Sequence, residues 1–381
     1  MMTAPTSGPQ ETSVQRVRPL ELFFDLVFVY TITHLTNLIA HPHGALDYLQ
    51  AALIFLSLMW MYDGFVWLSS NLELDADAEY WLMFAAMVTF FVMALGIPTI
   101  RGDGGVVFGL GLLLVTALHT GLFSRSATSS AQAIWGIAPY NFASALLVFS
   151  AAFVGGVWHW ALWLAAIGVL ILATLKRREQ AFALSPRHFA ERHGLLIIIA
   201  LGESVVALGL GAAGLPITPG LLAYAALGLL LAALVWWSYF GPDHERAERA
   251  FERAGAADRN RMALRGYGYS HMGMMSGIIM IAAGLEVGIH GPGEEDGAAW
   301  AWNLAVGLAL YFLSDVAFRR SLGLGPGRLR LLVGALALAT VPVGLSSGPL
   351  WQLLAAVLVV ALLSVVEDYV LPARAARRGP P

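Results

Sequence analysis

Glu203 is the residue of this chain whose type and position carry the most chemical information. It lies about thirteen residues into a long apolar segment, roughly 20 Å along a helix, and so near the middle of a bilayer. An ionisable side chain at that depth normally faces the protein interior or a water-filled path. A desolvated carboxyl there could take up and release a proton. The alternative is a structural hydrogen bond or ion pair that fixes helix packing.

Two more acidic residues, Glu21 and Asp25, lie one turn apart near the start of the first apolar segment, on one helical face. They could take part in transport, and Asp25 is the better candidate because it lies deeper. Carboxylates also complement the positive end of a helix dipole. Arg16 or Arg18 could pair with them, so a purely structural role is the alternative.

His34 lies near the middle of the same segment and shares its face with Tyr30 and Asn37, about half a turn away from Asp25. A histidine among polar neighbours in a membrane can relay protons near neutral pH. Such a histidine more often forms one stable hydrogen bond between helices. His34 and Asp25 are therefore expected to serve different contacts.

The elements that must position these residues are transmembrane helices. Apolar residues make up 58% of the chain and charged residues 12%, and the mean hydropathy is +0.70, outside the usual globular range. The apolar residues form runs long enough as helices to cross roughly 30 Å of hydrocarbon. We predict an all-α membrane protein of about twelve spans, at residues 20–40, 46–69, 80–98, 104–124, 138–155, 157–175, 190–211, 217–240, 266–289, 299–318, 329–346 and 349–371.

The distribution of Arg and Lys orients these spans, because positively charged loops are retained in the cytoplasm. With the N-terminus inside, all of the 22 basic residues except Arg101 fall in cytoplasmic segments. This predicts a multi-pass membrane protein with both termini in the cytoplasm. The N-terminal residues 1–15 and the C-terminal residues 373–381 are read as cytoplasmic tails, the first of them disordered.

This orientation gathers further ionisable residues in the cytoplasmic halves of the helices. They could form a polar vestibule leading from the cytoplasm toward Glu203. With Asp25, its predicted members are Asp63, His119, Glu191, His193, His271 and Asp315. Glu286, in the outer half of its helix, could line an exit. The alternative for Asp63, Asp315, Glu367 and Asp368 is pairing with nearby loop arginines.

The two halves of the chain carry a faint internal duplication. Glu21 can be laid on Glu191, Trp60 on Trp236 and Gly96 near Gly288, at offsets of 170, 176 and 192. The offsets grow mainly through an Arg- and Glu-rich insertion at 243–261, which we expect to form a helix at the membrane interface. We predict two parallel six-helix repeats, at residues 16–178 and 186–372, related by an axis along the membrane normal. Chance similarity between apolar segments is the alternative.

Small residues predict one site of close helix packing. The segment at 266–289 contains two GxxxG pairs, a spacing that lets another helix approach closely. Their glycines are Gly273, Gly277, Gly284 and Gly288.

Several function classes find no support in the sequence. There is no cysteine, hence no disulfide or thiolate metal site, and there is no Walker loop, GxSxG or HExxH motif. No cofactor or metal is predicted, and the basic residues do not form a nucleic-acid surface. The expected partners are the lipid bilayer and an unknown small solute or ion, a proton included, and the sequence predicts no oligomeric state.

Two segments resemble the low temperature requirement protein A (LtrA) family of bacterial membrane proteins. One is Pro19-Leu-Glu-Leu-Phe-Phe-Asp-Leu-Val-Phe-Val, and the other begins His188-Phe-Ala-Glu-Arg-His-Gly-Leu-Leu. The Trp236-Trp-Ser-Tyr-Phe segment also fits. The resemblance implies a multi-pass membrane protein of roughly residues 16–370, but the molecular activity of the family is not settled, and its name records a phenotype of growth in the cold.

Three hypotheses for function follow. The first is a transport protein, either a proton-coupled carrier or an ion-conducting path, with Glu203 at its centre and the cytoplasmic acids and histidines gating or relaying. The second is a membrane-embedded enzyme acting on a lipid or isoprenoid through acid-base chemistry, which would explain a cold phenotype through lipid composition. The third is a structural or accessory protein of the cell envelope. Because no catalytic spacing is recognisable, transport is favoured over enzymatic activity.

Overall fold

The protein is helical throughout the part of the chain described by the computed structural model, which covers residues 18–70, 77–125, 130–176, 184–291 and 297–367. The first six helices are α1 (Pro19–Ala40), α2 (Ala45–Ser69), α3 (Asp77–Leu95), α4 (Asp103–Ser124), α5 (Ser130–Ala151) and α6 (Gly156–Lys176). The later membrane helices are α7 (Pro186–Ala212), α8 (Pro219–Phe240), α11 (Ser270–Gly288), α12 (Ala299–Ser321), α13 (Arg328–Leu338), α14 (Val341–Ser347) and α15 (Pro349–Val365).

Length and apolar composition allow eleven helical runs of the described residues to cross a membrane, with α13 and α14 counted as one run. The helix α15 is apolar but shorter, at 17 residues. The predicted all-helical, multi-span fold is thereby confirmed. The count differs by one because the last predicted span was extended to residue 371, and its end lies outside the described residues.

Proline and glycine set several helix boundaries. Pro186, Pro219 and Pro349 occupy the first turn of their helices, where a missing N–H costs no intrahelical hydrogen bond. Between α5 and α6, Gly156 has a φ of +60°, a conformation that favours glycine. This turn separates two spans that follow each other closely. Pro342, in the first turn of α14, breaks the predicted span 329–346 into two helices.

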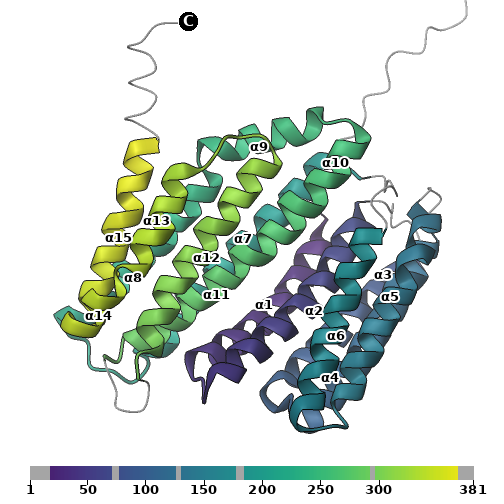
Figure 1. Cartoon of the computed structure of the whole chain (residues 1–381), viewed down its shortest axis with the longest axis horizontal. Coiled ribbons are helices and arrows are strands. Elements are labelled where there is room, and N and C mark those ends of the chain that lie inside the picture. Colours follow the sequence, from purple (N-terminus) through teal and green to yellow (C-terminus); the bar gives the residue numbers. More distant parts are fainter. Residues whose placement is uncertain (1–17, 71–76, 126–129, 177–183, 292–296, 368–381) are drawn as a thin grey trace, which may run out of the picture.

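The Arg- and Glu-rich insertion folds into two short helices, α9 (Pro242–Arg253) and α10 (Ala256–Met262), at one end of the bundle (Figure 1). Helix α9 is strongly amphipathic, and it buries Ala247 and Phe251 against the protein. A π-helical stretch, Ala263–Tyr269, joins α10 to α11 without a loop. The helix predicted to start near residue 266 therefore starts ten residues earlier.

The helices form two neighbouring groups, α1 to α6 and α7 to α15, with α1 and α2 along the boundary (Figure 1). Helix α1 packs against both α7 and α11 of the second group. The sequence duplication itself stays a prediction. The side chains of α1, α7 and α11 that face this boundary contain most of the ionisable residues discussed below.

Glycines allow close contact between α11 and its neighbours. A Cβ added at Gly273, Gly277 or Gly284 would lie 2.1 to 2.6 Å from an atom of α12. At Gly288 it would lie 2.3 Å from the hydroxyl oxygen of Tyr224 in α8. The GxxxG residues thus lie at helix contacts, on two different partner helices.

Gly277→Ala is expected to destabilise the protein by about 1–3 kcal/mol, because the new Cβ would lie 2.6 Å from the backbone oxygen of Gly307 and the helices must separate. Unfolding by SDS in mixed micelles measures this loss. Gly202→Ala is the matched control, since no heavy atom lies within 4 Å of a Cβ there. Equal losses for the two variants would contradict the packing role.

Candidate functional site

The best-connected polar group in the boundary is an ion-pair cluster centred on Arg192 of α7, a residue only 1% exposed. Arg192 Nη2 donates to Asp25 Oδ1 of α1 at 2.6 Å and to the hydroxyl of Tyr62 in α2 at 3.1 Å. The Tyr62 hydroxyl in turn donates to Asp25. The guanidinium Nη1 lies 3.7 Å from Glu21 Oε1. Three helices from both groups are therefore joined through one buried cation.

His188 adds a second basic side chain to this cluster. Its Nε2 lies 2.9 Å from Glu21 Oε2, and its Nδ1 lies 3.2 Å from Ser70 Oγ. The Ser70 hydroxyl already donates its hydrogen to the Val66 carbonyl, so it accepts from His188. We call Glu21, Asp25, Tyr62, His188 and Arg192 the Arg192 cluster.

Three of the predicted vestibule residues meet in a second buried group. His193 Nε2 lies 3.5 Å from Asp63 Oδ1, and the ring of His193 lies 5.1 Å from that of His271. His271 Nε2 is 2.8 Å from the hydroxyl of Tyr239, which can donate to it. These side chains lie in a row from α2 through α7 and α11 to α8, in which His193 and His271 touch through their rings and not through a hydrogen bond. A proton relay would need such a row of acid, imidazole and phenol groups.

Asp315 lies apart from these groups, in a cluster within the second group of helices. Arg330 Nη1 of α13 donates to Asp315 Oδ2 at 2.6 Å and to the Ser238 carbonyl at 2.9 Å. Its Nη2 donates to Glu367 Oε2 at 3.0 Å. Asp243, which is paired with Arg319, lies 3.5 Å from the same Nη2. The Asp315 carboxylate is therefore neutralised by a buried arginine. Asp368 lies outside the described residues.

Three other predicted residues do not join any of these groups. Glu191 is exposed on α7. His119 is buried in α4 between the rings of Phe65 and Phe123. His34 is half-buried and contacts the ring of Tyr30. The predicted single vestibule is thus divided into separate clusters, because helical neighbours in sequence project toward different partner helices.

Glu203 differs from the other buried acids in its partners. It is 1% exposed, and its Oε2 accepts a hydrogen bond from the Thr33 hydroxyl of α1 at 2.7 Å. Thr36, nearly one turn further on α1, also interacts with this carboxylate, although its Oγ1 forms no hydrogen bond of normal geometry. Within the described ranges, no Arg, Lys or His forms an ion pair with Glu203. A carboxyl in this setting can hold a proton or a cation.

Glu286 of α11 is a second acid, further along the bundle than Glu203. It is half-buried, and its carboxyl interacts electrostatically with Glu203 and with His41. Helices α7 and α11 nearly touch here, since a Cβ at Gly211 would lie 2.4 Å from the Glu286 carbonyl oxygen. Glu286 therefore lies between Glu203 and the α1–α2 connection at the end of the bundle away from α9.

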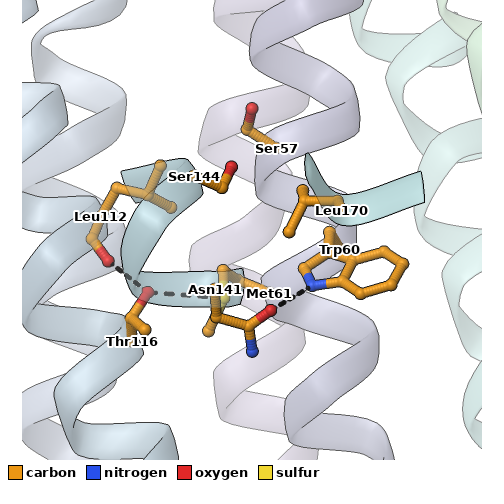
Figure 2. Close-up of a pocket in the computed structure, with 8 residues that line it drawn as sticks. All are labelled: Ser57, Trp60, Met61, Leu112, Thr116, Asn141, Ser144 and Leu170. Carbon is orange, nitrogen blue, oxygen red and sulfur yellow. Dashed lines mark hydrogen bonds between the residues drawn. The ribbon is translucent and has the colours of Figure 1, made fainter. Parts of the chain in front are cut away.

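A small polar cavity lies elsewhere, inside the first group of helices (Figure 2). Its volume of about 10 Å³ is roughly the space that one water molecule requires. The polar side chains around it include Asn141, which accepts a hydrogen bond from Trp60 Nε1 at 3.0 Å, and Ser57, Thr116 and Ser144. No predicted site residue lines it.

The family model described as bacterial low temperature requirement A protein (LtrA) matches residues 16–365. The chain belongs to the LtrA family. It is similar to an uncharacterized protein of Rhizobium meliloti (strain 1021), with 27% identity over 293 residues that cover 71% of this chain and 69% of the relative. No solved structure matches.

Sequence reasoning about this LtrA protein missed the cations of its clusters. The sequence pattern uses Arg192 and Arg330 only as signals of membrane orientation, and His188 enters it only through the family resemblance. One signal was present: Arg192 lies six residues into a helix that begins at Pro186, nearly two turns inside the helix. Among the described residues, no group of three or more His, Asp or Glu side chains could hold a metal ion.

Proposed function

We propose that this LtrA protein moves protons or other ions across the bacterial cytoplasmic membrane, as a proton-coupled carrier or an ion-conducting protein, with Glu203 as its central carboxyl. The observation that carries the proposal is the difference in charge compensation. Asp25, Glu21 and Asp315 are held by buried arginines or histidine, whereas Glu203 is held by a hydroxyl. A buried acid with no fixed counter-charge is suited to bind a mobile one.

The position of Glu203 between the two helix groups supports this role. In the first group, α1 contacts α2 and α3, and the order α3, α4, α5, α6, α2 is a chain of contacts. In the second group, α7 contacts α8 and α11. Each helix in the order α11, α12, α13, α15, α8 likewise contacts the next one. This parallel supports the proposed repeats at 16–178 and 186–372. Transporters built from repeats bind substrate at the repeat interface near mid-membrane.

The sequence offset gives a second argument. Thr33 and Glu203 are separated by 170 residues, the same offset that relates Glu21 to Glu191. Under the proposed duplication they are equivalent positions, and equivalent positions of two repeats come into contact only near the axis that relates them. Glu203 would then lie on that axis, along the membrane normal.

The other clusters receive roles consistent with this arrangement. Helix α9, which carries Arg246, Arg249 and Arg253, lies at one end of the bundle (Figure 1), and these charges support a cytoplasmic location for that end. The Arg192 cluster lies there, 11 residues or roughly 16 Å along α7 from Glu203, and would close the cytoplasmic end. The row from Asp63 to Tyr239 would relay protons, and Glu286 would line the outer exit.

Glu203→Gln is expected to abolish the flux, because the amide keeps the shape of the side chain but cannot carry a proton. Dissipation of an imposed pH gradient in proteoliposomes measures this, with a pH-sensitive dye inside. Glu245→Gln is the control, since Glu245 is an exposed acid on α9 and should leave the flux unchanged. Equal flux in wild type and Glu203→Gln would refute transport and leave a lipid-modifying enzyme or an envelope protein.

A further inference from the structure

We propose that Glu203 binds an alkali-metal cation at the place where it binds a proton, with the hydroxyl oxygens of Thr33 and Thr36 as further ligands. The proposal rests on the function proposed above and names the ion that competes with the proton. It starts from the hydroxyl oxygens of α1 and the carboxylate oxygens of α7, because a bound proton would not need all of them as hydrogen-bond partners.

Thr33 can serve two states of the site. Its hydroxyl oxygen lies 2.7 Å from Glu203 Oε2 and 3.3 Å from the Val29 carbonyl oxygen. A hydroxyl has one hydrogen and two lone pairs. When the hydrogen points to Val29, both lone pairs are free, so that Thr33 can face a cation beside the carboxylate.

Thr36 provides the independent observation. Its side chain is 1% exposed and interacts with the Glu203 carboxylate, but its Oγ1 forms no hydrogen bond of normal geometry. A buried hydroxyl without a full hydrogen bond is unfavourable, so a retained one calls for an explanation. A protonated Glu203 needs only one acceptor, which Thr33 supplies. A cation needs several oxygen ligands, and Thr36 would then be used.

Charge and ligand chemistry together select the class of ion. Glu203 brings one negative charge, so a monovalent cation leaves the site neutral, whereas a divalent cation would leave a net charge in a medium of low dielectric constant. All the candidate ligands are carboxylate or hydroxyl oxygens, which suit hard ions and not soft ones such as copper(I). Sodium, lithium and potassium meet both conditions.

The titratable surroundings leave Glu203 free to exchange the two ions. From α1, Thr33 and Thr36 face it and are neutral. From α11, Glu286 interacts with it electrostatically, and Glu286 in turn interacts with His41. In the described part of the chain, no basic residue forms an ion pair with Glu203.

Direct binding tests the proposal on the full-length protein in detergent at pH 8. Thermal unfolding is followed while NaCl, LiCl or KCl replaces choline chloride at constant ionic strength. At least one alkali cation is expected to raise the unfolding temperature saturably. Glu203→Gln should abolish this response, and lowering the pH should weaken it because protons compete for the carboxylate.

The threonines of α1 supply matched variants. Thr36→Val should raise the half-saturating cation concentration about tenfold, the factor expected from losing one ligand to a charged group. Thr31→Val is the control, because Thr31 is also buried on α1 without a partner but points about 140° away from Thr36. Thr36→Ser keeps the hydroxyl and should bind the cation like wild type. This variant still tests the site if Thr36→Val does not fold.

Each outcome separates this proposal from the proposed function. If choline raised the unfolding temperature as much as the alkali cations do, the cation site would be overturned. It would also be overturned if Thr31→Val and Thr36→Val weakened cation binding equally. A proton flux that depends on Glu203 but not on any alkali cation would leave transport standing and remove the cation. Saturable cation binding without a flux that depends on Glu203 would leave the cation site standing and remove the proposed transport function.

Discussion

Arg192→Met is expected to lower the free energy of unfolding by about 3–5 kcal/mol, the usual cost of removing one partner of a buried ion pair. Methionine fills much of the volume but leaves Asp25, which is 1% exposed, without its cation. Tyr62 would still donate to Asp25, but one neutral hydrogen bond does not compensate a buried charge. Glu21 keeps His188, so the loss falls mainly on Asp25.

Reversible unfolding in SDS and lipid-mimetic micelles measures the effect. Arg187→Met is the control, because Arg187 is exposed on the first turn of the same helix. Arg192→Met combined with Asp25→Asn removes both charges of the pair and should recover most of the stability. A double variant no more stable than Arg192→Met would mean that the arginine acts by packing and not by charge.

Arg330→Met has the second largest expected effect, again about 3–5 kcal/mol. The lost contacts are those to Asp315, to Glu367 and to the Ser238 carbonyl, of which Asp315 is almost fully buried. Glu367 is partly accessible and can be hydrated, so Asp315 determines the cost. The change should loosen the contacts that join α8, α12, α13 and the end of α15.

The same unfolding measurement applies, with Arg328→Met as the control two residues earlier, where the arginine is exposed. Adding Asp315→Asn to Arg330→Met should restore part of the stability but less than in the Arg192 pair, because the Ser238 carbonyl and Glu367 remain without their donor. Hydrogen exchange should show the loss in α12 and α13 and leave α1 unchanged. Faster exchange spread over both helix groups would argue against a local role.

The helices of this protein could be predicted from sequence because their signal is local. Runs of apolar residues, Pro19 and Pro219 in first turns, and Gly156 between α5 and α6 act within a few residues of where they stand. The break at Pro342 could have been predicted from the same rule. The length of the run that begins at Ala256 could not, since its polar first turns carry no apolar signal.

For the site, the sequence could predict only how deep in the membrane each candidate residue lies. Glu21, Asp25 and His193 were expected on one side of the membrane, but a helical wheel does not say which helix faces which. The pairing of Asp25 with Arg192 joins residues 167 positions apart, and it depends on the packing of α1 against α7. The same packing separates His119 and Asp315 from the others. Glu203 was singled out correctly as buried, but its hydroxyl partner was not foreseen.

The contrast between compensated clusters and Glu203 also has an electrical meaning. A membrane potential does little work on fixed, paired charges such as those of Arg192 and Asp25. It would act on the ion that we propose reaches Glu203. Full passage of one charge is worth about 2.3 kcal/mol per 100 mV, so a site about halfway across gains or loses about half of that, which alters its occupancy about sevenfold. Occupancy of Glu203 would therefore report the membrane voltage.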